Sequence, residues 1–273
     1  MAVSTDNYYS NSIVGQPQVG ADIDIYETSS SPKYAIGFGF TRGDGNKYRY
    51  GHFGELTNRG ALVGTDVSES GLAKIEDVGA LVANLTTRGS SINAPNAVGA
   101  RYMQLVITAT ANQFTGGYIT ITTGTGAGYT YRIRGNTATS AGSPVTGNIY
   151  LDLWDKIQVA IDSNSDIAIA GSSYANLEAA LSSDNPVPVG VAVTGNTITD
   201  YGWIQTAGVG GVLQDVSIFT IGSVVTVSSN TAGAVTNLPT TSSGSVYAAQ
   251  AVVGYGVEPG SSADYSIVNL TLE

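Results

Sequence analysis

The 273-residue sequence has no cysteine, few charged residues and no long apolar run. Without cysteine there can be no disulfide framework, no thiol nucleophile and no zinc site built on thiolates. Charged residues make up 12% of the chain, and this shortage disfavours long helices and coiled coils, whose exposed faces need Glu and Lys. No stretch approaches the roughly 20 apolar residues of a membrane span, and the first residues lack the features of a signal peptide. We therefore expect a protein that starts in the cytoplasm and has no contact with a membrane.

Basic residues are also scarce. The chain has 11 Lys and Arg against 21 Asp and Glu, for a formal net charge of −10. A protein that binds nucleic acid directly usually presents a basic stripe, and the few basic residues here are scattered along the sequence. This distribution argues against nucleic acid as a direct partner.

Glycine, serine and threonine are abundant, and alternating apolar residues recur at short intervals between glycine-rich or proline-containing breaks. Ser and Thr are poor in helix interiors and suit turns and strands. We predict an all-β fold, with one or more β-sandwich or barrel-like domains, an extended N-terminal arm and one or two short helices. The helices are expected at residues 68–82 and 172–181, where apolar residues follow helical spacing after Ser or Glu. The expected parts are the arm at 1–30, a β domain formed by 31–90 with 185–273, and an inserted or second β-rich domain at 91–184.

The clearest local signal is a hairpin. Asp44 and Gly45 separate two alternating runs, and type I′ turns favour this dipeptide because both central residues take positive φ. Gly124, Gly126 and Gly128 superficially resemble a phosphate-binding loop, but the lysine and the following helix of such a loop are absent. We interpret these glycines as a second hairpin turn.

Residues 1–30 contain Asn and Ser together with apolar side chains, and no hairpin partner lies close by in the sequence. Such a segment is too apolar for a solvated tail, so we expect it to order on a partner, by adding a strand to a sheet edge or by laying Tyr into grooves. The alternative is that it forms the first strand of the protein's own barrel. The candidate contact residues are Tyr8, Tyr9, Ile13, Val14, Ile23, Ile25 and Tyr26.

No convincing catalytic, metal or cofactor site emerges. His52 is the only histidine, and no Gly-x-Ser-x-Gly elbow accompanies it. Oxygen-bearing residues alternate from Asp162 to Asp166, as in a calcium loop, but Ile167 and Ser173 stand where an EF-hand needs Gly and Glu. Arg42-Gly43-Asp44 matches an adhesion tripeptide, which arises easily by chance in a glycine-rich chain.

Asp152 and Asp155 flank Trp154, so a sugar stacked on the indole between two carboxylates is conceivable. Residues 152 and 155 do not share a face of a regular strand, however. The simpler interpretation is that Trp154 packs inward and the aspartates lie at a turn.

The 16 Tyr against only 5 Phe indicate a different kind of function. Tyrosine is an amphipathic contact residue that is enriched at half-buried strand faces and interfaces. The composition therefore favours a protein that acts through contact.

Three segments carry a resemblance to a known family: residues 32–63, with the Asp-Gly turn and a Tyr-rich strand; residues 99–138; and residues 189–235 with 252–273, around Gly202-Trp203-Ile204-Gln205. Together they resemble capsid decoration (cement) and related head-surface proteins of tailed bacteriophages. The resemblance implies a β-rich protein on the outer surface of the virion, often trimeric, that is assembled in the host cytoplasm and uses an extended N-terminal segment to reach the lattice of the major capsid protein.

The resemblance implies the major capsid protein and further copies of this chain as partners, in a homotrimer. The chain is longer than the smallest members of this class, which leaves room for an added domain. A tail or head-fibre protein that binds a receptor or glycan, and a polysaccharide depolymerase, remain alternatives.

Overall fold

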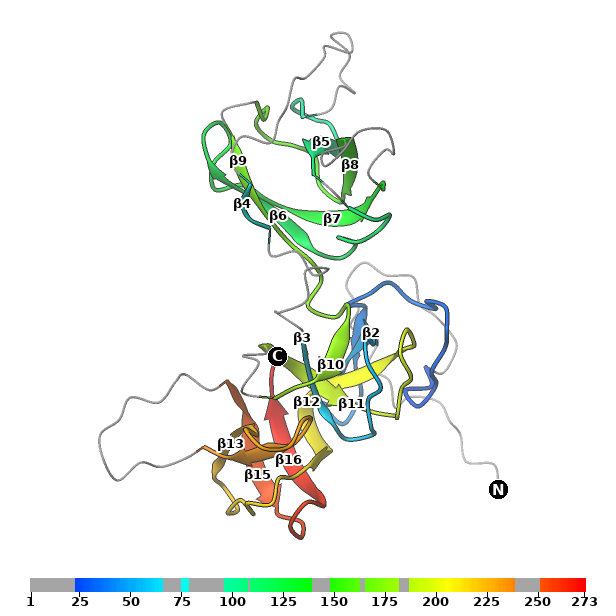
Figure 1. Ribbon diagram of the computed structural model, residues 1–273, viewed down its shortest axis with the longest axis vertical. Helices are drawn as coiled ribbons and strands as arrows, with labels where there is room; N and C mark the ends of the chain where they lie inside the picture. The colour runs from blue at the N-terminus through cyan, green and yellow to red at the C-terminus, as the bar shows by residue number, and fades with distance from the viewer. Residues whose placement is uncertain are drawn as a thin grey trace, which may run out of the picture. The chain divides into compact units, whose positions relative to one another are not determined.

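The computed structural model describes residues 23–65, 75–78, 96–107, 109–138, 148–162, 165–181, 187–238 and 251–273. Every regular element among these residues is a β-strand (Figure 1), and the strands form two curled antiparallel sheets, so the predicted all-β fold is confirmed. The chain divides into two compact units: the first combines residues up to Ser68 with Ser173–Glu273, and the second contains Glu69–Ser172.

The first unit contains a ten-stranded sheet. Eight strands run in the order β10, β3, β11, β12, β16, β15, β13, β14, while β1 pairs with β2 and β2 pairs with β12. The strands are β1 (Gly39–Thr41), β2 (Lys47–His52), β3 (Leu62–Thr65), β10 (Leu177–Ala179), β11 (Val187–Ala192), β12 (Tyr201–Leu213), β13 (Val224–Val227), β14 (Val235–Asn237), β15 (Val252–Glu258) and β16 (Tyr265–Thr271).

Strand β12 holds this sheet together. It has 13 residues, and its first half pairs with both β2 and β11, while its second half, from Ala207 to Leu213, pairs with β16. Residues 202–207 are all buried, as expected for a strand that is covered on both faces. The two ends of β12 therefore belong to different parts of the core.

Trp203, in the buried half of β12, is the centre of an aromatic cluster. Its indole is 1% exposed and lies 5.0 to 6.0 Å, centroid to centroid, from the rings of Tyr34, Phe38, Phe40 and Tyr50. Three of these contacts are edge-on or T-shaped, an arrangement that the ring quadrupoles favour. Trp203 is therefore an internal residue of the first unit.

The second unit contains a six-stranded sheet in the order β4, β9, β6, β7, β8, β5. Strict alternation explains its inner face: in β7, Tyr131 and Ile133 are buried, whereas Thr130, Arg132 and Arg134 are exposed. The strands are β4 (Ile75–Val78), β5 (Tyr102–Val106), β6 (Tyr118–Thr123), β7 (Thr130–Asn136), β8 (Asn148–Leu153) and β9 (Asp166–Ala170). The core includes Met103, Leu105, Phe114, Ile119, Ile121, Ile133 and Leu153.

Both predicted hairpins are confirmed, but the first turn is not of the expected type I′, because Gly45 has positive φ and Asp44 does not. Strands β1 and β2 pair around Asp44-Gly45, where Gly45 has φ 88° and the Asp44 carboxylate accepts a 3.0 Å hydrogen bond from the Asn46 amide. Strands β6 and β7 pair around the glycine-rich turn, in which Gly124, Gly126 and Gly128 all have positive φ. These glycines adopt a conformation that other residues rarely take.

The predicted helix at 172–181 is wrong. Asn176 has φ 54°, which ends any right-handed helix, and Leu177 begins β10, which pairs with β3. The carbonyls of Tyr174 and Leu177 accept hydrogen bonds from the amides of His52 and Gly54, so tertiary pairing replaces helical bonds.

The inserted unit ends at Ser172, before the expected boundary at 184. In the other predicted helix, 68–82, the described residues form β4, so that prediction is wrong there too.

Because each unit has its own core, we expect the two cores to respond separately to large-to-small substitutions. Trp203→Ala should destabilise the first unit by about 3–5 kcal/mol, and Ile119→Ala should destabilise the second by about 2–5 kcal/mol. Differential scanning calorimetry of both variants measures this. A single transition that both substitutions lower equally would show that the units unfold as one.

Candidate functional site

The segment expected to act as an arm is described from residue 23 onward. Ile25 is 5% exposed and belongs to the cluster around Trp203, and Ile23 packs against that cluster. Tyr26 is 64% exposed. The described end of this segment therefore contributes to the protein's own core, and Tyr26 is its large exposed side chain. The other candidate contact residues lie outside the described residues: Tyr8, Tyr9, Ile13 and Val14.

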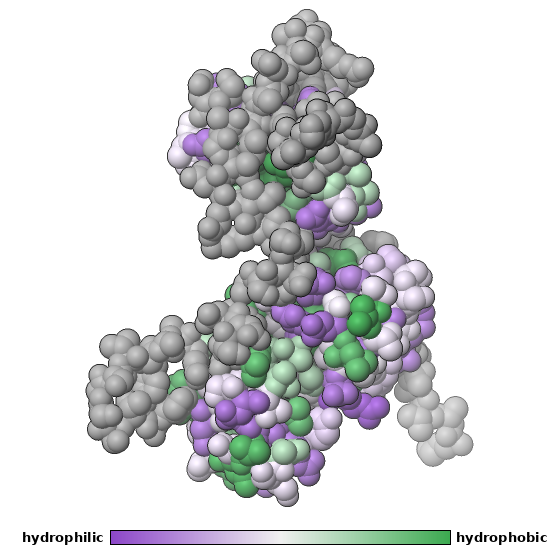
Figure 2. All heavy atoms as spheres, in the orientation of Figure 1, coloured by the Kyte–Doolittle hydropathy of each residue, from purple (hydrophilic) through white to green (hydrophobic). Residues whose placement is uncertain are grey.

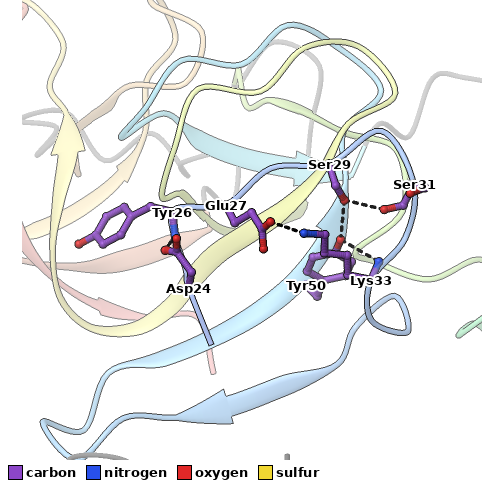
Figure 3. A network of polar contacts seen from close by, with 7 residues as sticks. All are labelled: Asp24, Tyr26, Glu27, Ser29, Ser31, Lys33 and Tyr50. Atoms are coloured by element: carbon purple, nitrogen blue, oxygen red, sulfur yellow. Dashed lines mark hydrogen bonds and ion pairs between the residues drawn. The ribbon is translucent and has the colours of Figure 1, made fainter. Parts of the chain in front are cut away.

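Polar contacts fix the continuation of this segment on the first unit (Figure 3). Ser29 and Tyr201 exchange two backbone hydrogen bonds of 3.0 and 2.7 Å, an isolated bridge beside β12. The Tyr50 hydroxyl lies 3.4 Å from the Ser29 hydroxyl and accepts a 3.2 Å hydrogen bond from the Lys33 amide. Lys33 also pairs with Glu27, but this ion pair is exposed and adds little stability.

The second half of β12, with β16 and β15, exposes apolar side chains on one face of the sheet. Val209 lies opposite Asn269, which in turn lies opposite Tyr255, so these three residues form a row across the strands. Two residues away on β16, and on the same face, Ile267 lies opposite Gly211. We define the outer apolar face by its large exposed side chains: Val209 (53% exposed), Tyr255 (47%), Tyr265 (51%) and Ile267 (42%).

Glycines leave space between the larger side chains of this face. A Cβ on Gly211 would have no atom within 4 Å, so open space lies beside Ile267 at this position. Gly60 has φ 71°, and a Cβ there would come within 2.6 Å of the Tyr265 ring, so glycine allows that ring to lie against the backbone. The face is therefore shaped by main chain as much as by side chains.

Hydrophobic side chains reach the surface, among hydrophilic ones, where Figure 1 shows β13, β15 and β16, as the space-filling view shows (Figure 2). Large exposed apolar patches on soluble proteins mark interaction sites. The outer apolar face is consequently the strongest candidate for a contact surface on the first unit.

A buried carboxylate fixes the chain where β12 ends. Asp215 is 1% exposed, and its side chain accepts hydrogen bonds from the Ser228 hydroxyl (2.7 Å), the Val216 amide (2.6 Å), the Thr231 hydroxyl (3.1 Å) and the Asn230 amide group (3.2 Å). Burial disfavours the charged form, but these donors outweigh it and lower the pKa of Asp215. This network ties the end of β12 to the turn after β13.

Gln214 and Ser266 link the same end of β12 to β16. The Ser266 hydroxyl donates a 2.5 Å hydrogen bond to the Gln214 side chain and accepts one of 2.8 Å from the Gly260 amide. The backbone amide of Gln214 donates a hydrogen bond to the Asp264 backbone carbonyl. These contacts hold β12 and β16, two of the three strands of the outer apolar face, in register.

His52 lies at the end of β2, and its ring centroid is 4.7 Å from that of Tyr201. Burial lowers its pKa, so the neutral imidazole is favoured. Among the described residues no hydroxyl or carboxylate forms a hydrogen bond with its ring, and the arrangement is that of a packed side chain.

Trp154 does not pack inward as expected. It is 49% exposed, because Leu153 occupies the inward position at the end of β8 and the next side chain points outward. Asp152, two residues earlier, shares the outer face and forms an ion pair with Arg134. Asp155 is exposed beyond the strand. Alternation along β8 was the signal that could have placed Trp154 outside.

The possible calcium loop is held by hydroxyl groups in the described structure. The Thr125 hydroxyl donates a 3.0 Å hydrogen bond to Asp162, and the Thr123 hydroxyl donates to Asp166. Residues 163 and 164 lie outside the described residues. Within the described ranges, no group of three or more His, Asp or Glu side chains is arranged to hold a metal ion.

The described part of the chain contains no helix long and apolar enough to cross a membrane. The chain matches no protein-family model, and no curated protein or solved structure is similar enough to count as a match. The functional argument therefore depends on the surfaces themselves.

The lowered pKa of Asp215 predicts a pH-dependent contribution to stability. The charged hydrogen bonds stabilise the fold above the unfolded pKa of about 3.9, and this contribution is lost as the pH falls through the lower folded pKa. Asp215→Asn should cost about 1–3 kcal/mol at pH 6, and the difference from the unsubstituted protein should shrink by pH 2. Urea unfolding at both pH values measures it. An equal difference at both would contradict this role.

Proposed function

We propose that this chain is a virion structural protein, a capsid decoration (cement) protein that binds the outer surface of the major capsid protein lattice of a tailed bacteriophage. The observation that supports it most is the outer apolar face on β12, β15 and β16, whose large exposed side chains lie on a rigid antiparallel sheet. A sheet face of this kind can bind a flat protein surface without rearrangement, as most preorganised interfaces do.

The composition of the chain supports a contact of this chemistry. Tyrosine is enriched at interfaces while Lys, Glu and Asp are depleted at their centres, and the outer apolar face presents two tyrosines, one valine and one isoleucine. Affinity at such a face comes mainly from shape and apolar burial, and the one charged residue paired with it is Glu258, which lies opposite Ile267.

Repetition on a lattice would strengthen a contact that is weak in a single copy. We propose a homotrimer, whose copies reach several lattice points together and so gain avidity without any strong individual site. We propose the N-terminal segment as a second contact with the capsid. Its described end presents Tyr26, which is 64% exposed and therefore accessible to a partner.

A tail or head-fibre protein is the alternative role, and the number of copies per virion separates the two. Quantitative mass spectrometry of purified particles should give a copy number on the order of hundreds for a decoration protein, since it follows the capsid lattice. A ring of a few copies, set by a single symmetry axis, would favour the fibre or tail.

Ile267→Glu tests the outer apolar face. The substitution adds a second carboxylate beside Glu258, in the middle of the face, so binding to particles that lack this protein should fall by tenfold or more, as desolvating a charge in an apolar interface is costly. Co-sedimentation with particles measures it. Ile198→Glu is the matched control, because Ile198 is 60% exposed on the turn before β12.

Both variants should melt within a few degrees of the unsubstituted protein. Equal binding by Ile267→Glu would exclude this face as the capsid contact, and an equal loss in both variants would indicate a nonspecific effect of added charge.

Deletion of residues 1–22 tests the N-terminal contact. Residues from Ile23 onward supply the packing on the aromatic cluster, so the shortened protein should keep its melting temperature. Its binding to particles should be lost or strongly weakened, as co-sedimentation would measure. Undiminished binding would show that the segment does not hold the capsid.

A further inference from the structure

The second unit carries an exposed surface that combines aromatic rings with arginine side chains. It lies on the outer face of β6, β7 and β8, the face opposite the Ile119 and Ile133 core. We define the arginine–tryptophan surface by its side chains: Arg101, Tyr118, Arg132, Arg134, Asp152 and Trp154.

The centre of this surface is a row across neighbouring strands. Tyr118 on β6 lies directly opposite Arg132 on β7, and the Trp154 amide donates a 3.0 Å hydrogen bond to the Arg132 carbonyl. The Arg132 guanidinium carbon is 6.0 Å from the centroid of the Trp154 ring. With strands about 4.8 Å apart, Tyr118 and Trp154 are separated by about 10 Å, with a guanidinium between them.

The two aromatic side chains are open to solvent without any ligand: Tyr118 is 50% exposed and Trp154 is 49% exposed. An indole this exposed is unusual, because tryptophan is highly buried on average. The backbone beneath it is fixed, since Arg101 donates a 2.5 Å hydrogen bond to the Trp154 carbonyl and Leu153 is fully buried. The rings are therefore held in place on a rigid base.

Charge is distributed unevenly between the two units. Residues 69–172 carry six basic and seven acidic side chains, a net charge of −1, whereas the rest of the chain carries five basic and fourteen acidic side chains, a net charge of −9. Arg134 is neutralised by Asp152. Within the described residues, neither Arg101 nor Arg132 has a carboxylate within ion-pair distance. The Arg132 guanidinium, and the N–H groups of Arg101 that do not bond the Trp154 carbonyl, can therefore bind an anion.

We propose that the arginine–tryptophan surface binds an acidic polysaccharide, whose sugar rings stack on Trp154 and Tyr118 and whose carboxylates pair with Arg132 and Arg101. The apolar face of a sugar ring fits an indole, and a guanidinium binds a carboxylate through two parallel hydrogen bonds. This proposal does not depend on attachment to a capsid.

Single-stranded nucleic acid is the other polymer that stacks on aromatic rings beside arginines. It carries a phosphate at every nucleotide and needs a continuous basic track, whereas Asp152 and Asp155 lie within and beside this surface. A uronic acid offers a planar carboxylate, which pairs with a guanidinium through two parallel hydrogen bonds, and a sugar face for the indole, so a uronic acid polysaccharide fits arginines beside Trp154 better.

The chain offers a direct optical readout of this site. It has two tryptophans, and Trp203 is 1% exposed, so a neutral quencher such as acrylamide should reach mainly Trp154. Polygalacturonate added to the full-length protein should protect Trp154 from quenching in a saturable way. Neutral dextran should protect it at least tenfold less effectively, because it lacks the carboxylates.

Substitutions then assign the contacts. Arg132→Gln should weaken polygalacturonate binding by about tenfold or more, and Tyr118→Ala by several-fold. Tyr129→Ala is the matched control: Tyr129 is 41% exposed in the same unit but stacks on Tyr131, on the opposite face from Arg132. It should bind as the unsubstituted protein does. Isothermal titration calorimetry gives the affinities, and circular dichroism verifies that each variant is folded.

Each result decides the proposal. Saturable protection by polygalacturonate that Arg132→Gln weakens and Tyr129→Ala leaves unchanged supports it. Equal protection by dextran, protection by oligo(dT) in place of polygalacturonate, or no protection by any polymer overturns it. An equal effect of the Tyr118 and Tyr129 substitutions would also overturn it, since only one of them lies on the proposed surface.

Discussion

The packing around Trp203 is the constraint on which the first unit depends. The residue lies in the half of β12 that is paired on both sides, and its ring is enclosed by side chains from the segment before β1, from β1 and from β2. Ile25 and Ile23 close the same cluster from the N-terminal side. Because β12 continues without interruption into its pairing with β16, the aromatic cluster also anchors the strand that carries half of the outer apolar face.

Local chemistry made part of this fold predictable. The Asp44-Gly45 and glycine-rich turns were recognisable because they require positive φ, and the strands of the second unit were recognisable by alternation. The helix expected at 172–181 was wrong because its spacing of Tyr174, Leu177 and Leu181 fits a helix, whereas the pairing of β10 with β3 depends on residues more than a hundred positions away. Tertiary pairing overrides such a weak local pattern.

The candidate surfaces were less predictable than the fold. The inward position assigned to Trp154 followed from its hydrophobicity, but the phase of alternation in β8 is set by Leu153, and only the strand register brings Arg132 and Tyr118 beside it. In the first unit, Val209, Tyr255 and Ile267 come from three strands whose order cannot be read from periodicity. The sequence identifies the individual aromatic, basic and apolar residues, but the order and register of the strands determine which of them lie side by side.

The attachment of the second unit has a consequence for how such a chain could have arisen. Strands β3 and β10 flank the inserted residues and are paired neighbours, with Thr65 opposite Leu177 and the Thr65 hydroxyl bonded to the Ser173 carbonyl at 3.1 Å. The two ends of the insertion therefore meet at one sheet edge, where a short hairpin would join them equally well. Because the entropy of closing a loop grows slowly with its length, a gene for the first unit could gain, lose or exchange this cassette with little change in the host fold.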